Sequence, residues 1–218
     1  MLFILKKYDK MNSEFKILRD KMKFFKDNSY DIVKLYINNI GISIFSLMLY
    51  FAAENIAKES AATFNLVISV FSIVFLMALV YCAGWDFGAK DRIHIDAKKM
   101  EMDKFKGLKL ALLADIPNFV LAFLSLVFLP LALLSGLQGF QVAFTACYAF
   151  MRLTMSLYIG VAQSISSLFS LSLEWTAIIE SILFILLPAL VIASTSFGYR
   201  LGVANKRLAQ LFTGKNQE

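Results

Sequence analysis

Between Lys109 and Arg200 the chain carries only four charged residues, which are Asp115, Arg152, Glu174 and Glu180. On a helix that faces hydrocarbon each charge costs roughly 2.5–3.5 kcal/mol, so all four need water or a partner. Hydrophobic residues make up 59% of the whole chain, and its mean hydropathy is +0.67. Soluble domains are about 45–50% apolar, so this composition predicts a membrane protein.

Four apolar segments have the length of a membrane-spanning helix, since about 20 residues cross a hydrocarbon core of about 30 Å. They are residues 32–53, 62–85, 110–134 and 178–199. Residues 141–175 are also apolar but are interrupted by Arg152, Gln163 and several serines. The pattern predicts an all-α, polytopic transmembrane helix bundle.

The basic residues predict how this bundle lies in the membrane. Eight Lys and Arg precede Lys34, six lie in the loop 86–107 and four lie in the tail 200–218, whereas residues 53–61 hold one. Basic regions stay on the cytoplasmic side of a membrane, and four spans place all three of these basic regions on that side. One further crossing by residues 141–175 would place the tail outside, and the segment is too short for two spans and a turn. We therefore predict four spans, cytoplasmic N- and C-termini, and an outer-side helical insert that is amphipathic or re-entrant.

Residues 1–31 are predicted to form a cytoplasmic amphipathic helix ahead of the bundle of residues 32–199. Apolar residues recur there every three or four positions, while the lysines lie off that stripe. The stripe consists of Ile4, Tyr8, Met11, Phe15, Leu18, Met22 and Phe25. Such a helix binds an anionic membrane surface. A parallel coiled coil between two copies, or docking on the protein's own loops, is the alternative.

The insert carries a polar stripe whose members fall on one helical face. They are Gln141, Thr145, Tyr148, Arg152, Ser156, Gln163, Ser166, Ser170 and Glu174, and Gly160 is a candidate break between two helices. In one interpretation the stripe faces water at the outer interface and Arg152 is solvated. In a second the stripe lines a polar path, with Arg152 attracting anions or paired with Glu174, Glu180 or Asp115. In a third it is buried against a partner protein.

Asp115 lies near the start of the third span, two residues before Pro117, which should kink that helix. It is a candidate intramembrane proton or cation site, and the alternative is a hydrated carboxylate paired with a neighbour such as Lys109. Asn39 and Asn38, near the start of the first span, are of a type that commonly bridges membrane helices.

Two pairs of glycines with Gly-x-x-x-Gly spacing lie at the predicted cytoplasmic ends of spans two and four. They are Gly84 with Gly88 and Gly198 with Gly202, and they are candidates for close helix packing or for helix ends. The aromatic residues beside them, Trp85, Phe87 and Tyr199, suit the interfacial belt.

The sequence contains no motif of a known catalytic site. There is no H-E-x-x-H, G-x-S-x-G or Walker lysine loop, and the single His94 has no cluster at metal-ligand spacing. We therefore expect no enzyme activity, no cofactor and no metal site. The net charge of +6 lies in the tails and one loop, which indicates an anionic membrane face rather than nucleic acid.

Three short patches carry a resemblance. They are Gly84–Arg92, Lys106–Lys109 and Gly198–Gly202. Together they are similar to a group of small multi-pass bacterial membrane proteins, and the resemblance implies a bacterial plasma-membrane location and no particular activity.

Two functions fit these observations. The first is a non-enzymatic subunit or accessory of a membrane assembly, in contact with lipid and with other subunits or further copies of itself, through the charged loop 86–107 and the N-terminal helix. The alternative is a small-solute or ion transporter or channel. Its polar path would include Gln141, Gln163, Arg152, Glu174, Glu180 and Asp115.

Overall fold

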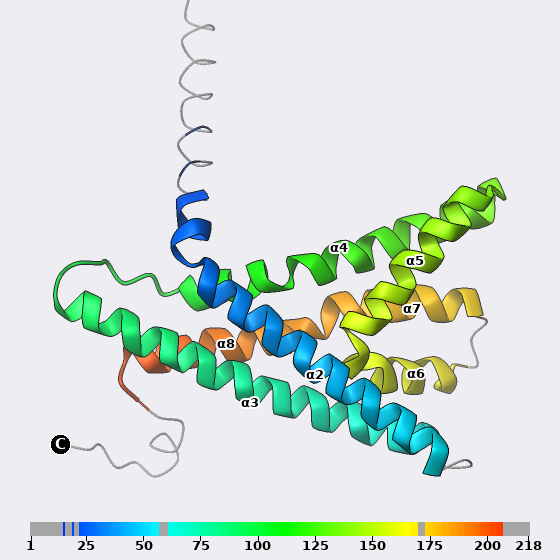
Figure 1. Ribbon diagram of the computed structural model, residues 1–218, viewed down its shortest axis with the longest axis horizontal. Coiled ribbons are helices and arrows are strands. Elements are labelled where there is room, and N and C mark those ends of the chain that lie inside the picture. The colour runs from blue at the N-terminus through cyan, green and yellow to red at the C-terminus, as the bar shows by residue number, and fades with distance from the viewer. Residues whose placement is uncertain (1–14, 16–18, 20–21, 57–60, 170–172, 207–218) are drawn as a thin grey trace, which may run out of the picture.

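The computed structural model describes Phe15, Arg19 and residues 22–56, 61–169 and 173–206, which form helices joined by short loops (Figure 1). Within these ranges there is no strand. The helices are α2 (Ser29–Ile56), α3 (Ala61–Asp96), α4 (Lys106–Ser135), α5 (Gln138–Thr154), the 3-10 turn η1 (Ser156–Tyr158), α6 (Ile159–Leu168), α7 (Leu173–Leu186) and α8 (Pro188–Val203). Most of the predicted N-terminal helix and of the C-terminal tail lies outside the described residues.

Four helical segments are long and apolar enough to cross a membrane. They are residues 29–53, 63–96, 106–135 and 174–203. The last consists of α7 followed by α8, which begins at Pro188, a residue suited to the first turn of a helix. The predicted all-α, polytopic bundle is confirmed, and the chain is an integral membrane protein.

The second span is longer than the sequence predicted. A loop was expected from Asp86 onward, but α3 continues to Asp96. The reason is tertiary packing, because Phe87 and Asp91 are only 2% and 8% exposed and keep the helix against its neighbours. With 36 residues, α3 is about 54 Å long, which exceeds a hydrocarbon core of about 30 Å.

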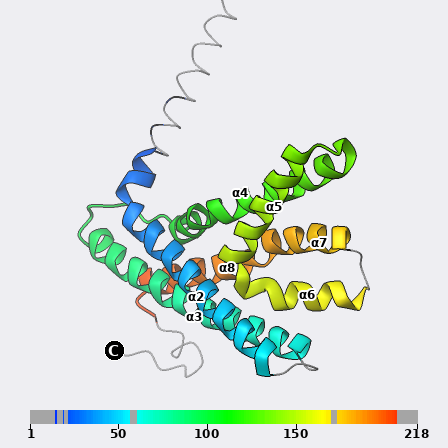
Figure 2. The same ribbon diagram turned by 45° about the vertical axis from the view of Figure 1, so that its right-hand side comes forward.

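The bundle has two distinct ends, which Figures 1 and 2 show from two directions. The start of α2, the loop 97–105 and residues 204–206 lie together at the loop end. The end of α2, the α4–α5 turn and the end of α6 lie at the opposite end, the hairpin end. At the α4–α5 turn Gly136 adopts a left-handed conformation (φ 64°) and its amide caps the Ala132 carbonyl, which ends α4.

The segments α5 and α6 form a bent hairpin (residues 138–168), which is apolar enough to be a broken span or a re-entrant loop. Helix α5 leads from the hairpin end to the middle of the bundle, and α6 leads back (Figures 1 and 2). The two are bent by 80° at a break between Thr154 and Ser156. The predicted break at Gly160 is therefore wrong in position, because the turn lies at Met155 and Gly160 is inside α6.

Candidate functional site

The hairpin turns only part of the polar stripe inward, because Gln141 and Thr145 of the same stripe are exposed. On the outer face of α5, Val142, Phe150 and Leu153 are 68%, 59% and 49% exposed. Ser156 and Ser166 of the polar stripe are buried. An apolar outer face suits lipid, so the hairpin has the opposite orientation to a helix that rests on the membrane with its polar face in water.

The tip of the hairpin is held by a polar seam, which we define as the buried side chains Ser43, Ser46 and Tyr50 of α2 and Asn65, Ser69 and Ser72 of α3. Ser43 Oγ donates to the Thr154 carbonyl at 2.6 Å, and Ser156 Oγ donates to the Ser43 carbonyl. The first bond satisfies the Thr154 carbonyl, which the break between α5 and η1 releases from helical pairing, and a membrane interior requires such groups to be paired. The second bond ties the side chain of Ser156 to α2.

Gly160 brings α6 into backbone contact with α3. A Cβ at this position would overlap the Asn65 carbonyl. The Gly160 amide donates to Ser69 Oγ at 2.8 Å and to Tyr50 OH at 3.2 Å. The glycine therefore lets the hairpin tip reach the polar seam.

Arg152 pairs with Glu180, one of the three acids considered from the sequence. Its Nε lies 3.6 Å from Glu180 Oε2, and Tyr148 OH donates to the same oxygen. The Glu180 side chain is 2% exposed and that of Arg152 is 35% exposed. The pair links α5 to α7, so Arg152 is neither isolated nor fully solvated.

The other candidate residues of the polar path do not join this pair. Gln141 and Glu174 are exposed near the hairpin end, and Gln163 is half-buried on α6. Ser170 lies outside the described residues. The 80° bend separates Gln163 from α5, Gln141 lies about three turns before Arg152 on α5, and Glu174 lies in the first turn of α7.

Asp115 lies elsewhere, between α2 and α4. It is 4% exposed, and its Oδ1 accepts hydrogen bonds from Asn39 Nδ2 at 2.8 Å and Asn118 Nδ2 at 3.1 Å. Pairing with Lys109 does not occur, because Lys109 Nζ lies 2.7 Å from Asp103 Oδ2. Asn39 bridges two helices, as its residue type indicated.

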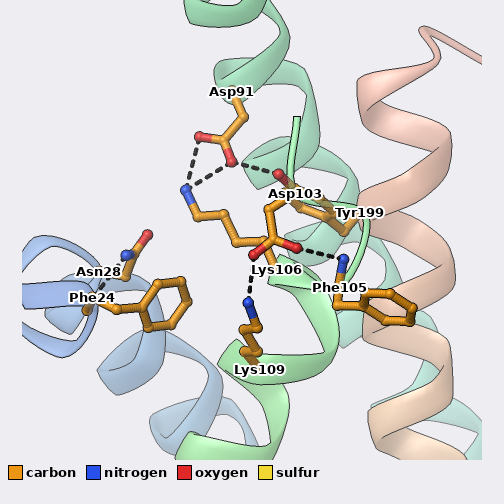
Figure 3. Close-up of polar contacts among 8 residues, drawn as sticks. All are labelled: Phe24, Asn28, Asp91, Asp103, Phe105, Lys106, Lys109 and Tyr199. Carbon is orange, nitrogen blue, oxygen red and sulfur yellow. Dashed lines mark hydrogen bonds and ion pairs between the residues drawn. The ribbon is translucent and has the colours of Figure 1, made fainter. Parts of the chain in front are cut away.

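Asp91, Lys106 and Tyr199 meet at the loop end (Figure 3). Lys106 Nζ lies 2.7 Å from Asp91 Oδ2, and Tyr199 OH donates to that oxygen at 2.7 Å. Each residue comes from one of the three patches that carry the resemblance. Phe87 and Tyr199 are buried in the core, so the prediction that they belong to the interfacial belt is wrong.

The neighbouring loop is fixed by Asp103, as Figure 3 also shows. Partial burial opposes ionisation of Asp103, but hydrogen bonds from Lys109 and the Phe105 amide outweigh it and hold the pKa of that carboxyl below its ordinary value. The loop therefore keeps a negative charge beside the start of α4.

The four glycines lie where α3 and α8 cross. A Cβ at Gly88 would overlap the Tyr199 carbonyl, and one at Gly202 would overlap the Trp85 carbonyl. Gly84 and Gly198 face backbone atoms of the opposite helix in the same way. Both helices continue through these residues, so their role here is close approach rather than helix termination.

Sequence reasoning missed the polar seam. Its members on α2 and α3 recur every three or four residues, which is the spacing of one helical face. This spacing indicates a polar face, but single serines are common in membrane helices, so the spacing alone does not identify a buried polar seam.

Among the described residues, no group of three or more His, Cys, Asp and Glu side chains is placed to hold a metal ion. No protein-family model, curated protein or solved structure matches this chain.

Proposed function

We propose that this integral membrane protein is a small-solute or ion transporter or channel, with a polar path along the inward face of the bent hairpin. The observation that carries the proposal is the burial of Ser156 and Ser166, two members of the polar stripe, against the bundle, while the apolar outer face of α5 is exposed. Broken helices at membrane depth are tolerated where they are buried in protein or line a cavity. In transporters, such broken helices form the solute site near the bilayer midplane.

The charges of the hairpin support this function. The Arg152–Glu180 pair holds two opposite charges inside the bundle without a net charge, next to the hairpin's inward face. Intramembrane ionisable residues of this kind mark solute paths more often than they stabilise a fold. The setting that we propose is a bacterial plasma membrane, with the basic loop end in the cytoplasm.

The test is flux through the purified full-length protein in lipid vesicles, with ²²Na⁺, ³⁶Cl⁻ and glycerol as probes. We expect at least one probe to cross faster than in protein-free vesicles. Arg152→Gln should abolish that flux, and Gly160→Val should do the same because its side chain displaces the hairpin tip from Asn65. Gly139→Ala is the matched control, since a Cβ there meets no atom within 4 Å.

Two results would contradict a transport function. One is the absence of accelerated flux for all three probes, and the other is equal flux in the wild type and Arg152→Gln. A non-enzymatic accessory subunit of a membrane assembly would then be the better description. The length of α3 favours that second candidate, because its charged end extends beyond the hydrocarbon core and offers a contact surface.

A further inference from the structure

The environment of Asp115 contains more oxygen acceptors than donors. Asn39 Oδ1 and Asn118 Oδ1 are buried and accept no hydrogen bond from the described residues. Both asparagines donate to Asp115 Oδ1, so the second carboxylate oxygen, Oδ2, receives neither of these hydrogen bonds. Buried polar atoms of this kind call for an unseen partner such as a water or an ion.

A small cavity lies beside Asp115 and Asn39. Asp115, Asn39 and Thr195 line it, and its volume of about 10 Å³ is near the minimum room for a single water molecule. Leu35, Val80 and Val191 form much of the remaining wall. Apolar walls of this size leave no room for a hydrated ion, so an occupant would have to shed its water and bind the oxygens directly.

We propose that Asp115 and Asn39 form a binding site for a dehydrated monovalent cation of the size of Na⁺, with Asn118 holding the carboxylate in position. Carboxylate and amide oxygens are hard ligands that suit hard cations. One carboxylate neutralises one positive charge, whereas a divalent ion would leave a net charge in a medium of low dielectric constant. A proton would serve one acceptor at a time, whereas a cation coordinates several together.

This site goes beyond the solute path along the hairpin, because it lies on α2 and α4. In the proposed transporter this site would bind the coupling ion. That role rests on the proposed transport function, whereas binding of the ion does not. Binding is therefore measured separately from flux.

The experiment is equilibrium binding of ²²Na⁺ to the purified full-length protein in lipid nanodiscs. We expect saturable binding that Li⁺ competes and that choline and K⁺ do not. Asp115→Asn, which keeps the shape and removes the charge, should weaken binding by more than about tenfold. Ser125→Ala is the matched control, because it removes another buried oxygen without a partner from α4 and should leave binding unchanged.

A second measurement keeps the proposal testable if Asp115→Asn does not fold. In the wild type, NaCl should raise the unfolding temperature above that in choline chloride at equal ionic strength, because a ligand of the native state stabilises it. Absence of both saturable binding and this shift overturns the site. A carboxyl infrared band that changes with pH but not with Na⁺ also overturns it and assigns a proton to Asp115.

The cation site and the transport function can be contradicted independently of each other. Saturable Na⁺ binding without flux of any probe supports this site and contradicts the transport function. Flux that persists with no Na⁺ binding supports the transport function and overturns this site.

Discussion

At the scale of single residues, the loop end depends on one charged pair that is mostly removed from water. The side chains of Lys106 and Asp91 are each 12% exposed, and Tyr199 donates a further hydrogen bond to the carboxylate. By contrast, the side chains of Lys109 and Asp103 are 52% and 37% exposed. Removing the lysine should therefore lower the stability of the protein more at the Lys106–Asp91 pair than at the Lys109–Asp103 pair.

Replacing Lys106 by Met should lower the stability of the protein by about 3 kcal/mol, because it leaves the Asp91 carboxylate buried without its cation. Lys109→Met, on the same helix, should cost less than about 1 kcal/mol. Thermal unfolding in detergent micelles measures both. Equal losses for the two variants would contradict the assigned role of the buried pair, and the double variant Lys106→Met with Asp91→Asn should recover part of the loss.

At the scale of elements, the hydropathy of each segment predicted the helices, and packing between helices determined the residues at which they end. Hydropathy predicted the spans because each segment carries enough apolar residues for its own insertion. It did not predict that α3 runs to Asp96, since that depends on Phe87 and Asp91 packing against other helices. Nor did periodicity predict the turn at Met155, because hydrogen bonds from Ser43 of α2 to Thr154 and from Ser156 to Ser43 hold it in place.

The α3–α8 crossing gives a direct test of the glycine spacing. Gly88→Ala should lower the unfolding temperature, because its Cβ overlaps the Tyr199 backbone and forces the helices apart. Gly41→Ala is the control within α2, where an added Cβ meets no atom within 4 Å. Alanine favours a helix over glycine by about 1 kcal/mol, so this control should be neutral or stabilising. A Gly88→Ala protein as stable as the control would argue against close packing at this site.

At the scale of the whole molecule, the topology depends on the hairpin returning to the end from which it started. Figures 1 and 2 show this return, and it leaves the basic loop and the end of α8 at one end of the bundle. A full crossing by the same residues would place them at opposite ends. The bend of 80° therefore helps to set the end of the bundle at which α8 finishes.

Cysteine mapping tests this arrangement in a background with Cys82 and Cys147 replaced by Ala. Single cysteines at Leu137 and Phe169, both exposed, should react with a membrane-impermeant maleimide from the same side. A cysteine at Met102, also exposed, should react only from the other side. Labelling of positions 137 and 169 from opposite sides would show that the hairpin is a fifth span.

Hydropathy and periodicity were enough to predict that the chain crosses a membrane, roughly where it does so, and which helical faces are polar. These properties follow from the composition and spacing of each segment alone. The pairing of Arg152 with Glu180 and the contact of Asp115 with Asn39 and Asn118 emerged only when the helices were packed together. Periodicity defines a face but not its neighbours, because those contacts join residues far apart in the chain.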